Sequence, residues 1–405
     1  MRRALLTLAV TIGMGVVASS TAVAGGAPAE RDDRGRPAVR FATFNASLNR
    51  PTAGLLRTRL EAAVAGTVDP QIQNVLNIIE AADADVLLIN EFDTGTDGDS
   101  TTVELFAELA GYPHSFTAPS NTGVASGFDL DNNGTVGVGN DAFGFGDFPG
   151  QFGLIVLSRY PIETSQVRTF QTFRWADMPG ALLPVAPSGQ PWYSPQELAV
   201  LRLSSKSHWD VPIDLGRGRD VHFLVSHPTP PVFDGPEDRN GRRNFDEIRF
   251  WADYITPGPT SRYIYDDAGR RGGLGGGERF VIAGDQNSDP LDGDSVPGAI
   301  QQLLDHRRVN TSVTPSSPGA VEAAALQGGA NATHESDPRF DTADFADTAP
   351  GNLRADYVLP SRNLRIDDAA VFWPVLADKP ESDWTGVFPF PSSDHRLVWV
   401  DIGHR

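Results

Sequence analysis

The stretch Phe280-Val281-Ile282-Ala283-Gly284-Asp285-Gln286-Asn287 sets a short apolar run directly before polar residues. A run of this length after the glycine-rich segment 272–277 predicts a strand over residues 279–283. Asp285 and Asn287 follow where the strand ends, and loops beyond strand ends are where binding and catalytic groups gather. The stretch therefore predicts a fold built on a sheet, with a candidate site at the end of this strand.

The same arrangement recurs along the chain. Other short runs typical of strands also have a polar residue at one end, and these residues are Asn45, Glu91, His227, Asp356, Asp394 and His395. One polar residue at a strand end is more often a turn former than a ligand. With Asp285 and Asn287 at the end of the 280–283 run, there are six such strand ends, two with histidine and four with carboxylates. This number favours one shared site.

Helical patterns lie between the strands. Asp69-Pro70 can cap a helix whose apolar residues from Ile72 to Ile79 have the spacing of one helix face. Strands and helices alternate, and no linker divides the chain. We therefore expect one α/β catalytic domain over residues 39–405. Its long loop insertions are expected at about 92–150, 171–220, 229–244 and 310–350.

Composition narrows the class of protein. The 405 residues include 33 Lys+Arg against 52 Asp+Glu, which gives a net charge of −19, and no Cys. These numbers, with 40% hydrophobic residues, exclude a disordered chain, a disulfide scaffold, a cysteine zinc site and a thiol nucleophile. The acidic balance counts against a protein that coats nucleic acid, which needs a basic surface. The composition does not exclude an enzyme that acts on phosphate esters through a bound metal ion.

The first residues indicate export. Arg2 and Arg3 precede a mostly apolar run over 4–17, and Ala22-Val23-Ala24 has the form that signal peptidase cleaves. We expect a signal peptide over residues 1–24, a linker over 25–38, and a secreted monomer without stable membrane insertion. An uncleaved membrane anchor is the alternative, but the apolar run is shorter than the roughly 18 residues of a span.

Seven segments in order resemble the endonuclease/exonuclease/phosphatase superfamily, which includes pancreatic deoxyribonuclease, abasic-site endonucleases, inositol polyphosphate phosphatases and bacterial sphingomyelinases. They are Thr43-Phe44-Asn45, Asp85 to Glu91, Gly153 to Ile162, Ser226-His227-Pro228, Gly284 to Asn287, Arg354 to Tyr357 and Ser393-Asp394-His395. The resemblance runs from about residue 40 to 402. It implies a four-layer α/β/β/α sandwich, in which two mixed β-sheets pack together with helices outside.

The resemblance also implies a metal site. Glu91 would be the principal carboxylate ligand, helped by Asn45, and Asp394 would be the second acidic residue near the ion. Oxygen ligands of this kind suit Mg²⁺ or Mn²⁺, which keep several waters and grip the phosphate of a substrate.

Five residues would carry the catalysis that the resemblance implies. Asp285 would orient or deprotonate the attacking water, and Asn287 would donate to a phosphate oxygen. His227 would donate to the phosphate or to the leaving oxygen. His395 would be paired with Asp356, which fixes its tautomer.

These features together predict an exported, metal-dependent phosphoesterase that cleaves phosphate mono- or diesters with water. The substrate stays open between nucleic acid and a small phosphoester. Arg239, Arg242 and Arg243 lie in a loop that either faces a phosphate-rich substrate or is a solvated surface loop. The alternatives are a non-catalytic calcium-binding extracellular protein that keeps the fold, and a sphingomyelinase-like lipid phosphodiesterase.

A second motif lies in the first insertion. Asp129, Asp131, Asn133 and Thr135 place oxygen side chains at alternate positions, with Gly134 at a tight turn. This is the front half of an EF-hand-type calcium loop, although the twelfth position is Asn140 and not a bidentate Glu. We expect either a structural calcium site or a surface turn here.

Overall fold

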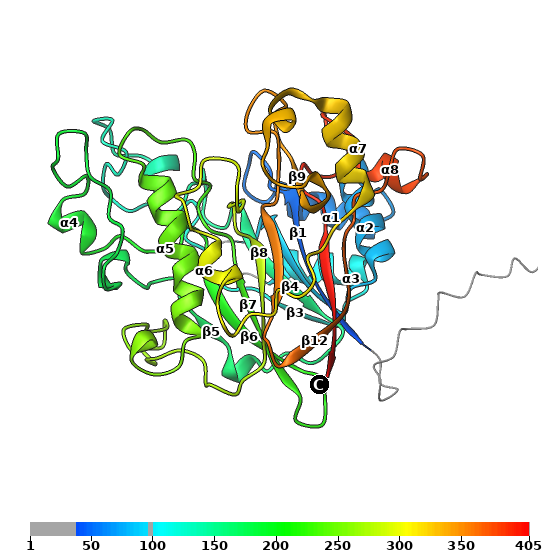
Figure 1. Cartoon of the computed structure of the whole chain (residues 1–405), viewed down its shortest axis with the longest axis horizontal. Helices are drawn as coiled ribbons and strands as arrows, with labels where there is room; N and C mark the ends of the chain where they lie inside the picture. Colours follow the sequence, from blue (N-terminus) through cyan, green and yellow to red (C-terminus); the bar gives the residue numbers. More distant parts are fainter. Residues whose placement is uncertain (1–37, 96–99, 405) are drawn as a thin grey trace, which may run out of the picture.

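A computed structural model describes residues 38–95 and 100–404 (Figure 1). The predicted signal peptide and all of the predicted linker except residue 38 lie outside the described residues. Two sheets make the centre of the molecule. The first has the strand order β12 (Leu364–Val371), β13 (Val398–His404), β1 (Val39–Leu48), β2 (Val86–Phe92), β4 (Gly153–Ser158), β3 (His114–Phe116). The second has the order β11 (Asp356–Pro360), β8 (Phe280–Asp285), β7 (Asp220–Ser226), β6 (His208–Asp214), β5 (Arg168–Thr169).

The central strands are apolar on both faces because each face packs against a different layer. In β2, Val86 and Leu88 point to the core between the two sheets, whereas Leu87 and Ile89 point to the helices. In β8 the core between the sheets receives Val281 and Ala283, and the other face packs on the second helical layer. Because successive side chains of a strand point to opposite faces, each of these strands contributes side chains to two hydrophobic cores.

Helices cover the outer face of each sheet (Figure 1). Against the first sheet pack α1 (Leu55–Val64), α2 (Pro70–Ala82) and α3 (Thr101–Ala110). The long helix α5 (Arg239–Tyr254) covers the second sheet together with α6 (Gln301–Leu304). The predicted four-layer α/β/β/α sandwich of two mixed sheets is confirmed. Besides several short 3₁₀ helices, the other α-helices and strands among the described residues are α4 (Pro195–Leu198), α7 (Pro318–Gln327), β9 (Ala343–Asp344), β10 (Asn352–Leu353) and α8 (Glu381–Thr385).

Strand directions bring the predicted site residues to one edge of the sandwich. β1 and β2 run parallel in the first sheet, and β7 and β8 run parallel in the second. The carboxyl ends of each pair therefore meet on the same edge. Strand β11 is antiparallel to β8 and starts there, so that Asp356 is the register partner of Asp285.

Some elements differ from the sequence expectation. Asp69 caps α2 as predicted, since its side chain accepts the N–H groups of Gln71 and Ile72. The segment 171–220 is not wholly a loop insertion, because it includes β6, a central strand of the second sheet. The segment 310–350 likewise includes α7 and β9, and the segment 92–150 includes α3 and β3. The predicted loop 229–244 ends in the first turns of α5.

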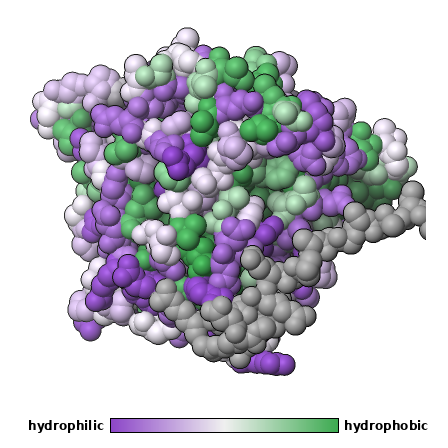
Figure 2. Space-filling view, turned by 45° about the vertical axis from the view of Figure 1, so that its right-hand side comes forward, coloured by the Kyte–Doolittle hydropathy of each residue, from purple (hydrophilic) through white to green (hydrophobic). Residues whose placement is uncertain are grey.

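The surface mixes polar and apolar residues. On the face shown in Figure 2, hydrophilic residues surround several separate hydrophobic patches. Within the part of the chain that the structure describes, no helix has the length and apolar character needed to cross a membrane.

Candidate active site

Glu91 leaves the first sheet at an irregularity. The register between β2 and β4 shifts between Asn90 and Phe92, and Glu91 has a φ of 57°, in the left-handed region. A residue other than glycine rarely adopts this conformation without a structural or functional reason. The bulge turns the Glu91 side chain out of the strand, and this side chain lines a cavity at the sheet edge.

The carboxylate of Asp285 lies at the centre of the site. Its Oδ2 atom accepts a hydrogen bond from Asn45 Nδ2 at 3.1 Å. The same oxygen lies 3.3 Å from Nε2 of His227 and 3.7 Å from Nε2 of His395. The site joins both sheets, because Asn45 belongs to β1 and Asp285 to β8. All four side chains are buried.

Behind this cluster, Asp356 holds His395. Nδ1 of His395 lies 2.8 Å from Oδ2 of Asp356, which also accepts a hydrogen bond from Thr342 Oγ1 at 2.8 Å. The Thr342 hydroxyl oxygen in turn accepts the backbone N–H groups of Ala355 and Asp356. The carboxylate is thereby fixed, and it leaves Nε2 of His395 directed at Asp285.

The two histidines differ in charge. Burial lowers the pKa of His395, but the carboxylates of Asp356 and Asp285 outweigh it and raise that pKa well above the ordinary value. Burial, together with the positive charges of Lys206 and His395, lowers the pKa of His227 well below the ordinary value. Burial raises the pKa of Asp285 to about 7, against the lowering effect of His395. The site therefore holds a protonated His395 and a neutral His227 at neutral pH.

The predicted metal ligands lie together beside this cluster. Burial raises the pKa of Glu91, and the negative charge of Asp394 acts in the same direction, whereas His395 and Asn45 act against it. Asp394 is only partly buried, and its Oδ1 atom accepts a hydrogen bond from Ser47 Oγ at 3.3 Å. The charge of Asp394 and the side chain of Asn45 both act on Glu91, and no arginine is paired with either carboxylate among the described residues. Two carboxylates and an amide oxygen are ligands that fit a hard divalent cation.

A second group of possible ligand atoms belongs to the cluster around Asp285. One ligand atom each from Asp285, Asp356 and His395 lies within 4.8 Å of the others. We assign this group to hydrogen bonding and not to metal binding, because the Nδ1 atom of His395 is already paired with Asp356.

Asn287 has a more structural setting than expected. Its φ is 49°, its backbone N–H donates to Asp285 Oδ1 at 2.9 Å, and its Nδ2 atom donates to the carbonyl of Pro228 at 3.1 Å. The side chain thus ties the end of β8 to the loop after His227. Its predicted role as a donor to phosphate stays a prediction.

The predicted calcium loop adopts a compact turn. Oδ1 of Asp129 accepts the N–H of Asn133 at 2.9 Å, and Oδ1 of Asn133 accepts the N–H of Thr135 at 2.8 Å. Ligand atoms of Asp129, Asp131 and Asp141 lie within 4.8 Å of one another. The loop is therefore closed by the carboxylate of Asp141.

Asn140, at the twelfth position of the loop, does not take the place of the expected glutamate. Its amide instead donates to Asp131 at 3.1 Å. Asp141 accepts the N–H groups of Leu130 and Gly137, so its carboxylate also organises the turn. Whether this loop binds calcium stays a prediction.

A cavity of about 490 Å³ opens beside Glu91, and it contains residues that the sequence pattern did not single out. The most notable is Lys206, which is 8% exposed and lies in the loop before β6. The sequence does contain a feature that sets Lys206 apart, because it is one of only two lysines in a chain whose other basic residues of this class are arginines. Arg239 and Arg243 also line the cavity, but they lie in the first turns of α5 and not in the loop that the sequence pattern predicted. Whether they face a phosphate-rich substrate stays a prediction.

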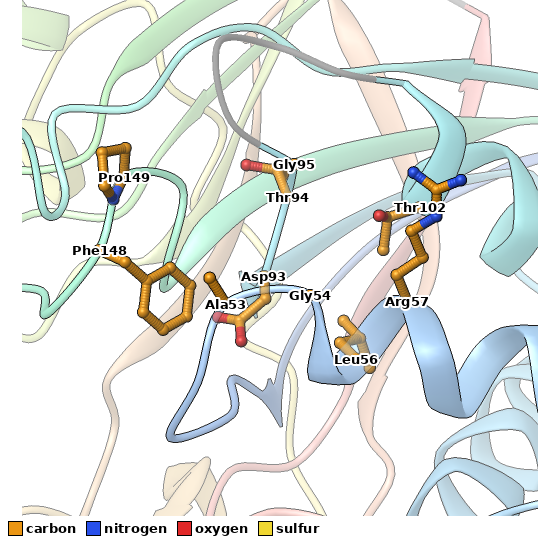
Figure 3. A pocket seen from close by; sticks show the side chains of 10 residues that line it. All are labelled: Ala53, Gly54, Leu56, Arg57, Asp93, Thr94, Gly95, Thr102, Phe148 and Pro149. Atoms are coloured by element: carbon orange, nitrogen blue, oxygen red, sulfur yellow. The ribbon is translucent and has the colours of Figure 1, made fainter.

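A smaller cavity of about 300 Å³ lies near Asp93, two residues beyond Glu91. Figure 3 shows the Asp93 side chain in this cavity, with Phe148 on one side and Arg57 on the other. The Asp93 carboxylate accepts the backbone N–H groups of Arg50 and Phe152, and burial raises its pKa to about 7. Asp93 therefore anchors the loops that flank Glu91.

Comparison with known proteins gives the family. The model of the endonuclease/exonuclease/phosphatase family matches residues 42–395. No curated protein matches the chain. Similar solved structures include an endonuclease/exonuclease/phosphatase from Beutenbergia cavernae, with 19% identity, a TM-score of 0.48, and coverage of 91% of this chain and 72% of that one.

Two further structures resemble the chain at lower identity. The catalytic domain of human Nocturnin has 14% identity and a TM-score of 0.46 over 91% of this chain and 95% of its own. Sphingomyelinase C from Streptomyces griseocarneus has 15% identity and a TM-score of 0.43 over 91% of this chain and 100% of its own. On the sequence match over residues 42–395, this chain belongs to the endonuclease/exonuclease/phosphatase family of phosphoesterases.

Proposed function

We propose that the protein hydrolyses phosphate mono- or diesters by direct attack of water, with a divalent cation held by Glu91, Asn45 and Asp394. The observation that carries the proposal is the setting of Asp285. A buried carboxylate with a pKa of about 7 lies within 4 Å of one neutral and one protonated imidazole. A general base works best when its pKa lies near the operating pH.

Each residue has a separate task in this proposal. Asp285 accepts the proton of the attacking water, and Asn45 holds the carboxylate by its hydrogen bond to Oδ2. His395, kept protonated by Asp356, donates toward the phosphate and stabilises the charge that develops there. A bound Mg²⁺ or Mn²⁺ supplies further positive charge and orients the phosphate.

The reaction forms no covalent intermediate with the protein. Water adds to phosphorus, the bond from phosphorus to the leaving oxygen breaks, and that oxygen takes a proton. The products are an alcohol and a phosphate, or a phosphate monoester when the substrate is a diester. We also propose that the protein acts outside the cell, on the strength of its N-terminal sequence alone.

A panel assay tests the proposed function. The purified protein is incubated with Mg²⁺, Mn²⁺ or Ca²⁺ and with plasmid DNA, RNA, bis-p-nitrophenyl phosphate, p-nitrophenyl phosphate or sphingomyelin. We expect metal-dependent release of product from at least one ester. An Asp285→Asn variant, prepared in parallel, controls for contaminating phosphatases. No turnover of any ester by the folded protein would favour the non-catalytic calcium-binding alternative.

A further inference from the structure

The cavity beside Glu91 has a positively charged inner wall. Lys206 is more than nine-tenths buried, and its ammonium group has no hydrogen bond or ion pair to any residue that the structure describes. Burial lowers its pKa, while the carboxylates of Glu91, Glu247 and Asp285 act to keep it charged. Burying a cation without a close partner costs free energy, unless a bound ligand supplies the opposite charge.

Arg243 adds a second cation to this wall. Its guanidinium donates to the backbone carbonyls of Leu203 at 2.8 Å, Phe143 at 2.5 Å and Arg202 at 3.0 Å. No ion pair joins it to an acidic side chain within the described ranges. Carbonyls orient the guanidinium but leave its charge uncompensated, which is unusual in a chain with a net charge of −19.

The wall is rigidly built. The buried carboxylate of Glu247, in α5, accepts the N–H of Ser205 and the N–H of Thr229, each at 2.6 Å. These bonds fix the loop of Lys206 against the loop that follows His227. The backbone carbonyl of Lys206 also accepts the N–H of Asn121 at 2.8 Å. The loop that carries Lys206 is therefore held in place before any ligand binds, as is typical of ligand sites.

Two aromatic side chains at the cavity are open to solvent. Phe233 is 83% exposed and Phe145 is 59% exposed, although both line the same cavity as Lys206. The ring of Phe145 lies beside that of Phe152, with 6.3 Å between the ring centroids. Exposed phenyl rings near buried cations offer a stacking surface for a flat ring and charge for an anion.

We propose that this cavity selects small nucleotide-like phosphate esters, with a second phosphate group on Lys206 and Arg243 and an aromatic base against Phe145 and Phe233. The inference rests on the proposed function and names its substrate class. Glu91 lines the same cavity, so a substrate held there reaches the catalytic residues with its other phosphate. Water then releases inorganic phosphate from that ester and leaves the second phosphate on the nucleoside.

The same features disfavour a choline lipid. Its quaternary ammonium group would lie beside Lys206 and Arg243, and like charges at close range repel. Duplex DNA is disfavoured by the acidic balance of the chain and by the concave shape of the site.

The experiment compares three soluble esters. Adenosine 3′,5′-bisphosphate offers a ring and two phosphates, adenosine 5′-monophosphate a ring and one phosphate, and fructose 1,6-bisphosphate two phosphates without the ring. We expect kcat/KM for adenosine 3′,5′-bisphosphate to exceed both others by at least about tenfold, as one charged hydrogen bond contributes. Sphingomyelin vesicles serve as the lipid arm.

Variants locate the preference. Lys206→Met keeps the apolar stem and should reduce the ratio of kcat/KM between the adenosine bisphosphate and the monophosphate by about tenfold or more. Phe233→Ala, at an exposed position, should reduce the ratio between the adenosine and fructose bisphosphates. Lys379→Met is the matched control, because the other lysine is exposed and paired with Asp383, and it should change neither ratio.

The outcomes are distinct. Turnover of p-nitrophenyl phosphate without any preference among the three esters would overturn this inference and leave the proposed function standing. So would a preference that Lys206→Met and Phe233→Ala leave unchanged, or faster cleavage of sphingomyelin than of the bisphosphate. Failure of the protein to hydrolyse every ester would overturn the proposed function itself.

Discussion

Nδ1 of His395 lies 2.8 Å from Oδ2 of Asp356, and both side chains are buried. A carboxylate at this distance favours the imidazolium and fixes which ring nitrogen is directed at Asp285. The bond connects β11 to the loop before β13, so it also joins the second sheet to the first. Loss of activity in a variant could therefore arise from chemistry or from folding, and an experiment must separate the two.

His395→Ala and Asp356→Asn should each lower kcat/KM by at least about 100-fold, since a positioned acid–base group contributes that much or more. If the two residues act as one unit, the double variant should be little worse than His395→Ala alone. Steady-state kinetics test this, with circular dichroism to show that each variant folds. His306→Ala is the control, and strictly additive losses would show that the pair does not act as a unit.

The metal prediction concerns Glu91. Dialysis against EDTA should abolish turnover, and Mg²⁺ or Mn²⁺ should restore it. Glu91→Gln keeps the shape of the side chain but removes one negative charge, so the metal concentration for half-maximal activity should rise at least about tenfold. Glu80→Gln, on the exposed face of α2, should leave that concentration unchanged. Full activity in EDTA would contradict the assignment.

The loop of Asp129, Asp131 and Asp141 makes a separate prediction. If it binds calcium, millimolar Ca²⁺ should raise the melting temperature, because a ligand bound only by the native state stabilises it. Asp131→Ala should abolish the shift, and Asp294→Ala, at an exposed position outside the loop, should retain it. Differential scanning calorimetry with and without Ca²⁺ measures both. A melting temperature that Ca²⁺ leaves unchanged would favour the surface turn.

The sequence predicted the fold and most of the site for one physical reason. Buried strands such as 85–89 and 280–283 are apolar on both faces, so the polar residue that follows each run marks the end of a strand. Parallel neighbours then bring these ends together. Asn45, Asp285 and His227 were predicted in this way, and His395 was predicted as the residue before the last, antiparallel strand. The structure places all four in one cluster.

Strand β6, which the sequence pattern did not predict, contains polar residues that are buried with hydrogen-bond partners. In β6, Trp209 and Val211 face the core between the sheets, but they alternate with His208 and Asp210. This alternation is typical of a half-exposed strand, yet Asp210 is buried and accepts a hydrogen bond from Tyr254 of α5. Such tertiary pairing cannot be read from local pattern.

Lys206 was missed for a related reason. A lone lysine is usually solvated at the surface. Only the structure shows that the carboxylate of Glu247 accepts the N–H groups of both Ser205 and Thr229. These bonds hold the two loops together, and Lys206, the residue after Ser205, is thereby buried at the cavity. Thr342 is similar, because its contact with Asp356 spans 14 residues of loop and short strand.

Gly284 makes a prediction about stability. Its φ is 144°, and a Cβ atom there would lie 1.9 Å from the backbone oxygen of Ser226 in the neighbouring strand β7. Gly284→Ala should therefore destabilise the fold by about 1–3 kcal/mol or more, through steric overlap and backbone strain. Urea denaturation measures the change. Gly277→Ala is the matched control, because a Cβ at that position meets nothing within 4 Å. Equal stability of the two variants would contradict the close approach of β7 to β8 at this position.

The last prediction concerns pH and the pair of His222 with Asp210. Nδ1 of His222 lies 2.6 Å from Oδ1 of Asp210. Burial lowers the pKa of His222, but the hydrogen bond and the charge of Asp210 outweigh it and leave the pKa above the ordinary value. Glu278 and Asp220 act in the same direction. Because the folded pKa is raised, the stabilisation is complete below the unfolded pKa of about 6.5 and is lost as the pH rises through the folded pKa.

Removal of this histidine should therefore cost more at low pH than at high pH. His222→Gln should lower the free energy of unfolding more at pH 5.5 than at pH 9, as measured by urea denaturation of both proteins at each pH. His306 supplies a contrast within the chain, because burial and the charges of Arg307 and Arg308 lower its pKa. Neutral His306 is favoured in the fold, so its contribution is lost as the pH falls, and His306→Gln should show the opposite trend. A loss for His222→Gln that is equal at both pH values, or greater at pH 9, would mean that the pair with Asp210 does not favour the charged imidazole.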